Sequence, residues 1–459
     1  MEFSPKFTEY LTEAAGDDNA RIALEALAGA ASVSVRLNPV KTKADKNTAD
    51  SIFGMDTAPV RWSPYGYFLP TRPQFTLDPL MHAGCYYVQD SSAMFVGTAF
   101  RQILSEMSGR ARVLDLCAAP GGKTTDILAS MRMSGKESSL LVANEIMKQR
   151  ATVLADNAGI WGDPSAVVTS ADPKAFAGIP GFFDIIVADV PCSGEGMFRK
   201  DEEAVAQWSA DNVALCQARQ RRIIADVWPA LAEGGFLIYS TCTFNKYEND
   251  DNVAWIASEL GAEPIQVNAD FPGLLSTRYG VSLIPGLVPG EGQYSAILKK
   301  TASVNAGSKA PKPRTSDGNA IPRIFRERIQ DLFQIPVDLT LKGDLTIAVP
   351  KALSEDISRL EFLHPLLRGT AVGTIKGKDI VPDADLALSN VLRKDAFPTA
   401  EVSREQALAF LHRDTITLDG AERGIVLLTY GGHPVGFVKN LGNRCNNLHP
   451  QSRRIRMNI

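Results

Sequence analysis

Two cysteines of the sequence each follow an apolar run, a position from which a thiol can act as a nucleophile. Cys192 stands in "VADVPCSGEGMF" (187–198) and Cys242 stands in "IYSTCTFN" (238–245). A thiolate is the strongest nucleophile among the common side chains, and its availability depends on the local pKa. A lone buried cysteine is more often an inert packing residue. Two of them, each at the end of a strand and both expected to face the same crevice as Asp189, favour a shared reaction site.

A glycine-rich turn precedes these cysteines and has the form of a cofactor site. In "LDLCAAPGGKT" (114–124) a strand is followed by small residues and a helix start. Small residues let the backbone approach a ligand, and a helix N-terminus offers free N–H groups. The GGKT ending is not a P-loop, because that motif needs a glycine where Cys117 stands, and G-x-G-x-x-G is absent too. The candidate cofactor contacts in this turn are Cys117, Ala118, Ala119, Pro120, Gly121, Gly122 and Lys123.

Three acids follow three successive strands after this turn. They are Glu145, Asp172 and Asp189. Any one of them alone would more often be a helix cap or a solvated loop residue. Together, at one edge of a sheet, they indicate a nucleoside cofactor that needs no polyphosphate site. S-adenosylmethionine fits, because carboxylates favour its positively charged sulfonium, whereas NAD is disfavoured without G-x-G-x-x-G.

A thiol, a carboxylate and a methyl donor suit methylation of C5 of a pyrimidine. C5 is a poor nucleophile until a thiolate adds to C6 and makes C5 enamine-like. A carboxyl group at N3 can stabilise the added electron density. After methyl transfer the C5 proton must leave and the first thiol must be expelled, and a second thiol can assist. The residue pattern leaves open which cysteine attacks.

The elements that must position these residues alternate regularly. From about 111 to 300, apolar strands alternate with helices, which predicts an open, doubly wound α/β sheet. A chain of 459 residues is expected to form two or three domains. We expect an N-terminal α+β extension at 1–100, the α/β domain at 101–300, a linker rich in Ser, Ala, Lys and Pro at 301–320, an α+β subdomain at 321–385 and a further module at 386–459.

Composition excludes several classes of protein. Six scattered cysteines without a CxxC pair argue against a disulfide framework or a zinc knuckle and favour the reducing cytoplasm. No apolar run reaches about 18 residues, and the start of the chain lacks the apolar core of a signal peptide, so no membrane contact is expected. His412, His433 and His449 are too dispersed for a metal site, and we predict none.

Basic residues gather locally although the net charge is −4. Phosphates are attracted by a local patch of positive charge and not by the net charge of the whole protein. A local basic surface therefore indicates nucleic-acid binding. After Glu422 the chain has no acid, which is a marked segregation of charge. The candidate phosphate contacts are Arg199, Lys200, Arg219, Arg221 and Arg222 near the cysteines, and Arg423, Lys439, Arg444, Arg453, Arg454 and Arg456 in the C-terminal stretch.

Several segments together resemble the RsmF/NSUN family of RNA cytosine-5 methyltransferases. These are "DLCAAPGGKT", "ADVPCSGEGMFRK", "CQARQ" and "YSTCT", with "VRLNPVKT" and "YVQDSSAM" nearer the N-terminus. "CSGEGMFRKD" and the long C-terminal extension resemble the bacterial RsmF branch, which acts on small-subunit ribosomal RNA. "GHPVGFVKNLGNRCNN" resembles the PUA-like module of that branch. The resemblance covers the whole chain and is strongest from 85 to 300.

The resemblance implies a Rossmann-like S-adenosylmethionine-dependent domain and a role for each site residue. It makes Cys242 the nucleophile and Cys192 the residue of product release, with Asp189 in the catalytic set. The cofactor set is the turn 117–123 with Glu145, Arg150, Asp172 and Asp189. The implied partner is ribosomal RNA, within the small ribosomal subunit, with no protein partner expected.

Two departures from the family pattern and two alternatives accompany this interpretation. Ile160 stands where the family usually has arginine, and "TSADP" (169–173) is not the commonest form of its segment. The same chemistry on transfer RNA is one alternative. The other is a ribosome-assembly factor that binds RNA without catalysis, which both cysteines and the acid series disfavour.

Overall fold

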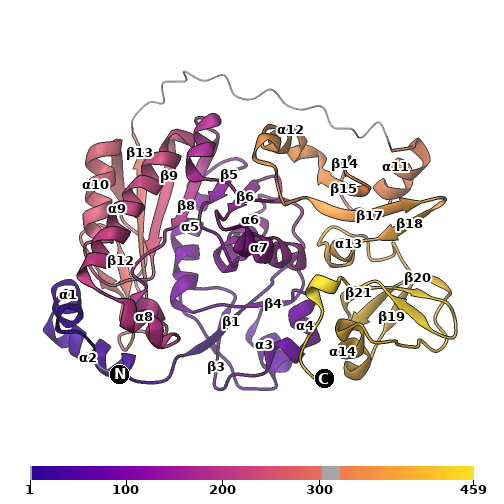
Figure 1. The fold of residues 1–459 in the computed structure, drawn as a ribbon, viewed down its shortest axis with the longest axis horizontal. Helices are drawn as coiled ribbons and strands as arrows, with labels where there is room; N and C mark the ends of the chain where they lie inside the picture. The colour runs from indigo at the N-terminus through magenta and orange to yellow at the C-terminus, as the bar shows by residue number, and fades with distance from the viewer. Residues whose placement is uncertain (1–2, 302–320) are drawn as a thin grey trace.

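The computed structural model describes residues 3–301 and 321–459. The predicted linker 301–320 therefore lies outside the described residues apart from Thr301. The described chain forms four sheets, one of ten strands and three of four strands. Figure 1 shows the large sheet at the left and centre, and the two C-terminal sheets at the right. The predicted doubly wound α/β architecture is confirmed.

Five parallel strands form the centre of the large sheet. They are β5 (Arg112–Asp115), β6 (Leu140–Asn144), β7 (Ala166–Thr169), β8 (Phe183–Asp189) and β9 (Leu231–Thr241). Their spatial order is β9-β8-β5-β6-β7, so the direction of winding reverses between β5 and β8. Ligands of such sheets bind at the carboxyl ends of the strands near this reversal.

Antiparallel strands extend the sheet at both edges. On one side lie β13 (Gln293–Lys300), β12 (Val281–Leu283), β11 (Leu275–Ser276) and β10 (Ala262–Ile265). On the other side β16 (Leu367–Arg368) pairs with β7. Because β16 follows the predicted linker in the sequence, the C-terminal part of the chain contributes a strand to the central sheet.

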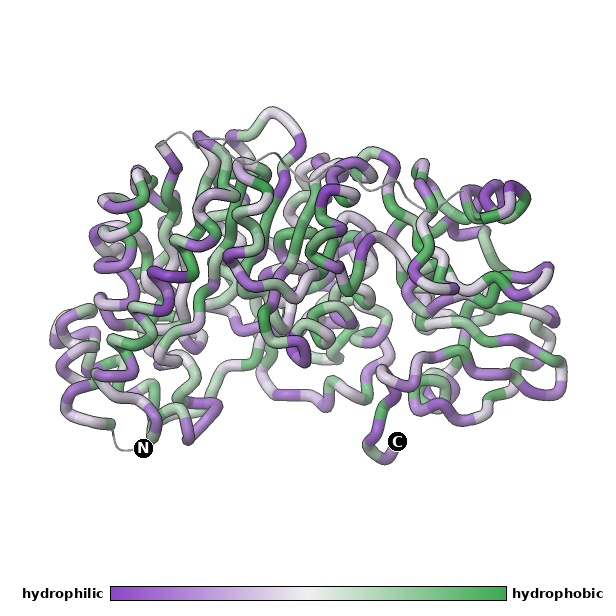
Figure 2. Tube along the Cα trace, turned by 45° about the horizontal axis from the view of Figure 1, so that its top comes forward, coloured by the Kyte–Doolittle hydropathy of each residue, from purple (hydrophilic) through white to green (hydrophobic). Residues whose placement is uncertain are grey.

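Helices cover both faces of the sheet and enclose two apolar cores. They are α5 (Phe95–Glu106), α6 (Gly122–Met133), α7 (Lys148–Trp161), α9 (Ala210–Val227) and α10 (Asp250–Leu260). Phe100 and Ile127 belong to one core cluster, and Ile224 and Val253 belong to the other. The strands between them are mostly hydrophobic along their length (Figure 2). Each fully buried Ile, Val or Phe side chain stabilises the fold by roughly 2 kcal/mol.

The N-terminal segment packs against the start of α6. Its sheet has the order β2-β3-β1-β4, and its elements are α1 (Pro5–Ala15), α2 (Asp17–Leu27), β1 (Val33–Leu37), α3 (Lys46–Phe53), β2 (Ala58–Pro59), β3 (Gly66–Leu69), α4 (Pro79–His82) and β4 (Tyr86–Val88). Arg36 on β1 is fully buried and donates hydrogen bonds to the Gly122 carbonyl and the Thr125 hydroxyl. The guanidinium therefore connects this sheet to the helix that follows the glycine-rich turn.

The C-terminal segment contains two further sheets. The first comprises β14 (Val337–Lys342), β15 (Leu345–Pro350), β17 (Thr370–Lys376) and β18 (Asp379–Pro382), with α11 (Arg323–Gln330), α12 (Ser354–Arg359) and α13 (Ala384–Leu388). The second comprises β19 (Thr399–Glu401), β20 (Gly424–Tyr430), β21 (His433–Asn440) and β22 (Cys445–Asn447), with α14 (Arg404–His412). Among the residues described, no helix has the length and apolar character needed to cross a membrane.

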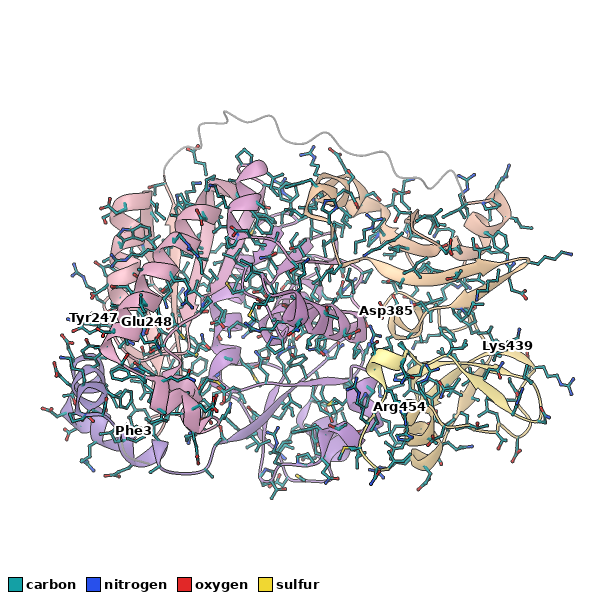
Figure 3. The ribbon with its side chains drawn as sticks, viewed as in Figure 1. Phe3, Tyr247, Glu248, Asp385, Lys439 and Arg454 are labelled. Atoms are coloured by element: carbon teal, nitrogen blue, oxygen red, sulfur yellow. The ribbon has the colours of Figure 1, made fainter. Side chains whose placement is uncertain are left out.

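Arg453 connects this segment to the central domain. Its guanidinium lies 3.0 Å from Asp156 on α7 and 2.8 Å from Asp385 on α13, and its side chain is 11% exposed. Arg453 is thus part of an internal ion-pair group, which corrects its assignment to the phosphate-binding surface. Asp385 is labelled in Figure 3 between the central and C-terminal parts.

Replacing Arg453 by alanine should destabilise the protein by about 2 kcal/mol, because two partly buried carboxylates lose their counter-charge. Denaturant unfolding measures the change. Arg456→Ala is the matched control, because Arg456 lies three residues away and is exposed. Equal stability of the two variants would contradict the structural role of Arg453.

Candidate active site

Cys192 and Cys242 lie side by side at the carboxyl edge of the sheet. The parallel strands β8 and β9 are neighbours, with Asp189 paired in register with Ser240. The two sulfur atoms are 3.2 Å apart, and both side chains are half-buried. The hydrogen bond with Cys242 and burial raise the pKa of the Cys192 thiol well above its usual value. The structure thus brings together the two cysteines that the sequence pattern singled out.

Asp189 connects the cysteines to the glycine-rich turn. Its Oδ2 accepts a hydrogen bond from the Lys123 ammonium at 2.8 Å. Its Oδ1 accepts from the Ser240 hydroxyl at 2.8 Å and from the Gln293 amide at 2.9 Å. Burial lowers the pKa of Lys123, but the charge and hydrogen bond of Asp189 outweigh burial and leave that pKa raised. An ammonium and a carboxylate are therefore held as an ion pair beside the thiols.

The glycine-rich turn lies between β5 and α6 and is fixed by α7. The Arg150 guanidinium donates to the Ala119 carbonyl at 2.8 Å, and the Asn157 amide donates to the Pro120 carbonyl at 2.7 Å. Gly121, with φ of 113°, occupies a conformation that favours glycine and provides no side-chain cap for α6. The first N–H groups of α6 are thus free of a side-chain acceptor from the residue that precedes the helix.

The predicted acids have different surroundings. Glu145 is buried, accepts the Met147 N–H at 3.0 Å and lies 3.3 Å from Arg150. Asp172 is exposed, and its carboxylate accepts the Lys174 N–H at 2.9 Å at the start of a short 3-10 helix. Glu145 lies next to the arginine that binds the turn, whereas the contact of Asp172 is that of a helix cap.

Asp115 is a buried acid of the site that the sequence analysis did not single out. It ends β5, and its Oδ2 accepts a hydrogen bond from the Thr124 hydroxyl at 2.7 Å. Its Oδ1 has no hydrogen-bond partner among the described residues. Burial raises the pKa of this carboxyl to about 7. The position of Asp115 as the acid of "LDLC" is a signal that could have identified it. Gln293 was missed as well, because nothing in the sequence around Gln293 indicates that its amide contacts Asp189.

These residues have the chemistry needed to hold S-adenosylmethionine. Free N–H groups at the start of α6 suit a carboxylate, and a buried carboxylate after the second strand suits ribose hydroxyls. The carboxylate of Asp189 suits a sulfonium. Burial strongly raises the pKa of the Cys117 thiol within the turn, so that thiol stays protonated and contributes packing rather than charge.

The basic residues near the cysteines are not all available to a ligand. Arg199 forms an ion pair with Glu291 at 2.7 Å and is 8% exposed, which corrects its assignment to the phosphate-binding surface. Lys200 lies 3.3 Å from Asp90. Of the candidate phosphate contacts in the C-terminal stretch, Arg423, Lys439, Arg444 and Arg456 are exposed.

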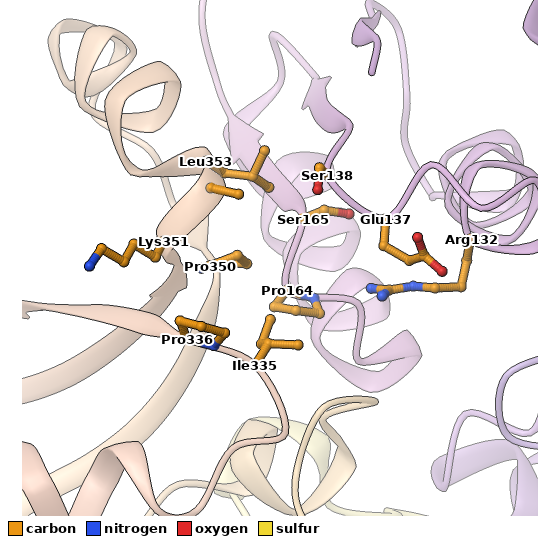
Figure 4. Close-up of a pocket in the computed structure, with 11 residues that line it drawn as sticks. Arg132, Glu137, Ser138, Pro164, Ser165, Ile335, Pro336, Pro350, Lys351 and Leu353 are labelled. Carbon is orange, nitrogen blue, oxygen red and sulfur yellow. The ribbon is translucent and has the colours of Figure 1, made fainter. Parts of the chain in front are cut away.

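A cavity of about 370 Å³ lies elsewhere in the protein, between the central domain and the β14–β15 hairpin (Figure 4). Pro164 and Ser165 border it just before β7, and Glu137 and Ser138 border it just before β6. It therefore opens at the amino ends of the parallel strands, whereas the cysteines follow the carboxyl ends. None of the candidate site residues lines it.

Three family models match the chain. The model described as 16S rRNA methyltransferase RsmB/F matches residues 102–299. The N-terminal domain of 16S rRNA methyltransferase RsmF matches residues 3–91, and the methyltransferase RsmF PUA domain matches residues 397–455. The matches confirm the resemblance found in the sequence, including the PUA-like character of the C-terminal module.

Relatives of similar length are also found. The chain is 31% identical over 441 residues to ribosomal RNA small subunit methyltransferase F of Cronobacter sakazakii, covering 91% of this chain and 89% of the relative. It is 29% identical over 442 residues to the protein of the same name from Escherichia coli O157:H7, with the same coverage.

Solved structures share the fold over about two thirds of the chain. A methyltransferase homolog from Pyrococcus horikoshii has a TM-score of 0.55 at 23% identity, covering 65% of this chain and 95% of that chain. NSun6 from Pyrococcus horikoshii with SFG has a TM-score of 0.54 at 16% identity, covering 66% of this chain and 99% of that chain. These similarities show a Rossmann-like methyltransferase fold.

The buried carboxyl of Asp115 should make stability depend on pH. Its pKa is raised from 3.8 to about 7, so the folded state binds a proton that the unfolded state releases. Stability should therefore fall as pH rises from about 4 to 7, by at most about 4 kcal/mol from this group. The variant Asp115→Asn should not lose stability in this way. Its melting temperature, compared with that of the unmodified protein, should therefore increase as pH rises. A difference that does not change with pH would contradict the assignment.

Proposed function

Because the chain belongs to the RsmB/F family of 16S rRNA methyltransferases, we propose that it methylates C5 of a cytosine in small-subunit ribosomal RNA. The observation that carries the proposal is the pair of thiols 3.2 Å apart, beside an aspartate that binds a lysine. Two thiols and one carboxylate are the groups that this reaction requires.

S-adenosylmethionine supplies the methyl group when it is bound. The turn 117–123 and Arg150 would hold its methionine end, Glu145 its ribose hydroxyls, and Asp189 would lie near its sulfonium. Asp172 would contribute at the outer side of this set, where its carboxylate is exposed.

Cys242 is the nucleophile of this proposal. Its thiolate adds to C6 of cytosine, the C6–S bond forms, and the π electrons move toward C5 and N3. The Lys123 ammonium stabilises this charge and donates a proton to N3, while the Asp189 carboxylate, which accepts three hydrogen bonds, holds that ammonium in place. The addition makes C5 reactive enough to accept a methyl group.

Cys192 serves product release. Once C5 carries the methyl group, water accepts the C5 proton, the C5–C6 double bond re-forms, the C6–S bond breaks and N3 returns its proton to Lys123. The departing Cys242 sulfur takes a proton from the Cys192 thiol, which lies 3.2 Å away. The hydrogen bond with Cys242 and burial raise the pKa of Cys192, so that thiol carries a proton until Cys242 departs.

The RNA must present an unpaired or flipped cytosine, because a base in a helix cannot meet a thiolate. We propose that Arg219 and Arg222 on α9 contact its phosphates, together with Arg423, Lys439, Arg444 and Arg456 of the C-terminal stretch. We place the protein in the cytoplasm with ribosomal RNA as its partner. Transfer RNA is the alternative substrate, and mapping of the modified base by bisulfite sequencing distinguishes the two.

Cys242→Ala should reduce methyl transfer to small-subunit RNA by more than about a thousandfold, because the nucleophile is lost. Cys192→Ala should slow turnover and accumulate a covalent RNA adduct, visible as a shifted band on a denaturing gel. The control is Cys445→Ala, which removes a buried thiol from the C-terminal sheet. Full activity of Cys242→Ala would refute the assignment, and a protein with no activity and no cofactor binding would favour an assembly factor.

Glu145→Gln should weaken binding of S-adenosylmethionine by about ten- to a hundredfold, because a charge-assisted hydrogen bond is worth about 1.5–3 kcal/mol. Asp172→Asn should weaken it less, because that side chain is exposed. Titration calorimetry measures both. Unchanged affinity in Glu145→Gln would remove that residue from the proposed cofactor set.

A further inference from the structure

Glu195, in the loop that follows Cys192, binds the loop that follows Cys242 through its carboxylate. Glu195 is 1% exposed and accepts the backbone N–H groups of Phe244 and Asn245. It also accepts hydrogen bonds from the Asn245 amide at 2.8 Å and the Trp208 indole at 3.0 Å. The backbone just after Cys242 is therefore fixed by a residue of the other loop.

Glu248, in the loop that follows Cys242, binds the loop that follows Cys192 through its carboxylate. Glu248, labelled in Figure 3, follows Cys242 by six residues. Its side chain is fully buried. Its Oε2 accepts the Ser193 N–H at 3.0 Å, and its Oε1 accepts from the Asn245 amide at 2.9 Å. The backbone just after Cys192 is thus fixed by a residue of the Cys242 loop.

Gln220 on α9 completes the contacts around Cys192. Its Nε2 donates to the Pro191 carbonyl at 3.0 Å and to Glu248 Oε2 at 2.7 Å. The carbonyl before Cys192 and the N–H after it are therefore both bound to the pair formed by Gln220 and Glu248. The segment "CQARQ" contains this glutamine, and the proposed chemistry above gives it no role.

The orientation of the Gln220 amide is determined by its other contacts. The Tyr239 hydroxyl lies 3.2 Å from Gln220 Oε1, and the Asn252 amide donates to the same oxygen at 2.7 Å. Because the amide oxygen receives these donors, the nitrogen is directed toward the Cys192 loop. All three side chains are essentially buried, so this geometry is shielded from water.

The two thiols have neighbours of opposite charge: the Glu248 carboxylate acts on Cys192, and the Lys123 ammonium interacts with Cys242. The carboxylate of Glu248 is among the charges that raise the pKa of Cys192, after the hydrogen bond with Cys242 and burial. Burial and the charge of Glu195 raise the pKa of Glu248 itself to about 7. On the other side, the Lys123 ammonium lies near Cys242. The charge of the Cys242 thiolate is one of the causes that raise the pKa of Lys123, after burial, which lowers it, and Asp189.

We propose that Glu248 and Gln220 are positioning residues that place the Cys192 thiol against Cys242 and are thereby required for product release. They bind the peptide groups on both sides of Cys192 and need touch neither the RNA nor the methyl donor. The inference rests on the proposed function, because it assigns to this pair the geometry that the release step uses. Glu195 has the equivalent structural place on the Cys242 side.

The test compares Glu248→Gln with Glu195→Gln in the full-length protein, using small-subunit RNA and S-adenosylmethionine. Glu248→Gln should slow turnover and raise the adduct fraction on a denaturing gel by about fivefold or more, as Cys192→Ala does. Glu195→Gln should lower adduct formation, because it loosens the backbone that follows the attacking thiol. The double variant Cys192→Ala/Glu248→Gln should accumulate no more adduct than Cys192→Ala alone.

A purely structural role would affect both steps alike, so the inference is overturned if Glu248→Gln and Glu195→Gln both lose adduct and turnover together. Melting temperature and binding of S-adenosylmethionine report whether each variant folds. If Glu248→Gln does not fold, Gln220→Leu carries the same expectation, because it removes the hydrogen bonds that the Gln220 amide donates to the Pro191 carbonyl and to Glu248. Adduct in Cys192→Ala but none in Glu248→Gln and Gln220→Leu refutes this inference alone. No adduct in Cys192→Ala refutes the release role of Cys192 and this inference with it. Methyl transfer by Cys242→Ala at the unmodified rate refutes the proposed nucleophile.

Discussion

The parallel pairing of β8 with β9 is the constraint on which the candidate site depends. The register that pairs Asp189 with Ser240 ends both strands at the same edge, so the loops that carry the two cysteines start together. A shift of one residue in either strand would turn its side chains to the opposite face. The sulfur separation of 3.2 Å and the contacts of Asp189 follow from this register.

Polar groups buried at this edge impose a second constraint. A buried carboxylate is costly unless donors surround it, and the site meets this condition by crossing its contacts between loops. Glu195 and Glu248 each accept N–H groups from the opposite loop, and Asp189 accepts three donors from different elements. The same hydrogen bonds that make burial tolerable therefore fix the positions of the thiols.

The N-terminal and C-terminal segments contact the two helices of the central domain that border the glycine-rich turn, α6 and α7. Arg36 from the N-terminal sheet binds the first turn of α6, and Asn157 on α7 binds the glycine-rich turn. Arg453 near the C-terminus binds Asp156, the neighbour of Asn157 on the same helix. The candidate RNA-binding module and the glycine-rich turn are thus connected through one helix by short, direct contacts.

The sequence by itself determined the alternation of strands and helices, the glycine-rich turn and the cysteines, because apolar periodicity and turn residues act locally. Only the tertiary structure decided which acids are buried and that β16 joins the central sheet. It also decided that Arg199 and Arg453 form internal ion pairs. The partners of these groups lie tens to hundreds of residues away. Gln220 and Glu248 show the reason most clearly: each is an ordinary polar residue in the sequence, and only the packing of α9 against two loops places both beside Cys192.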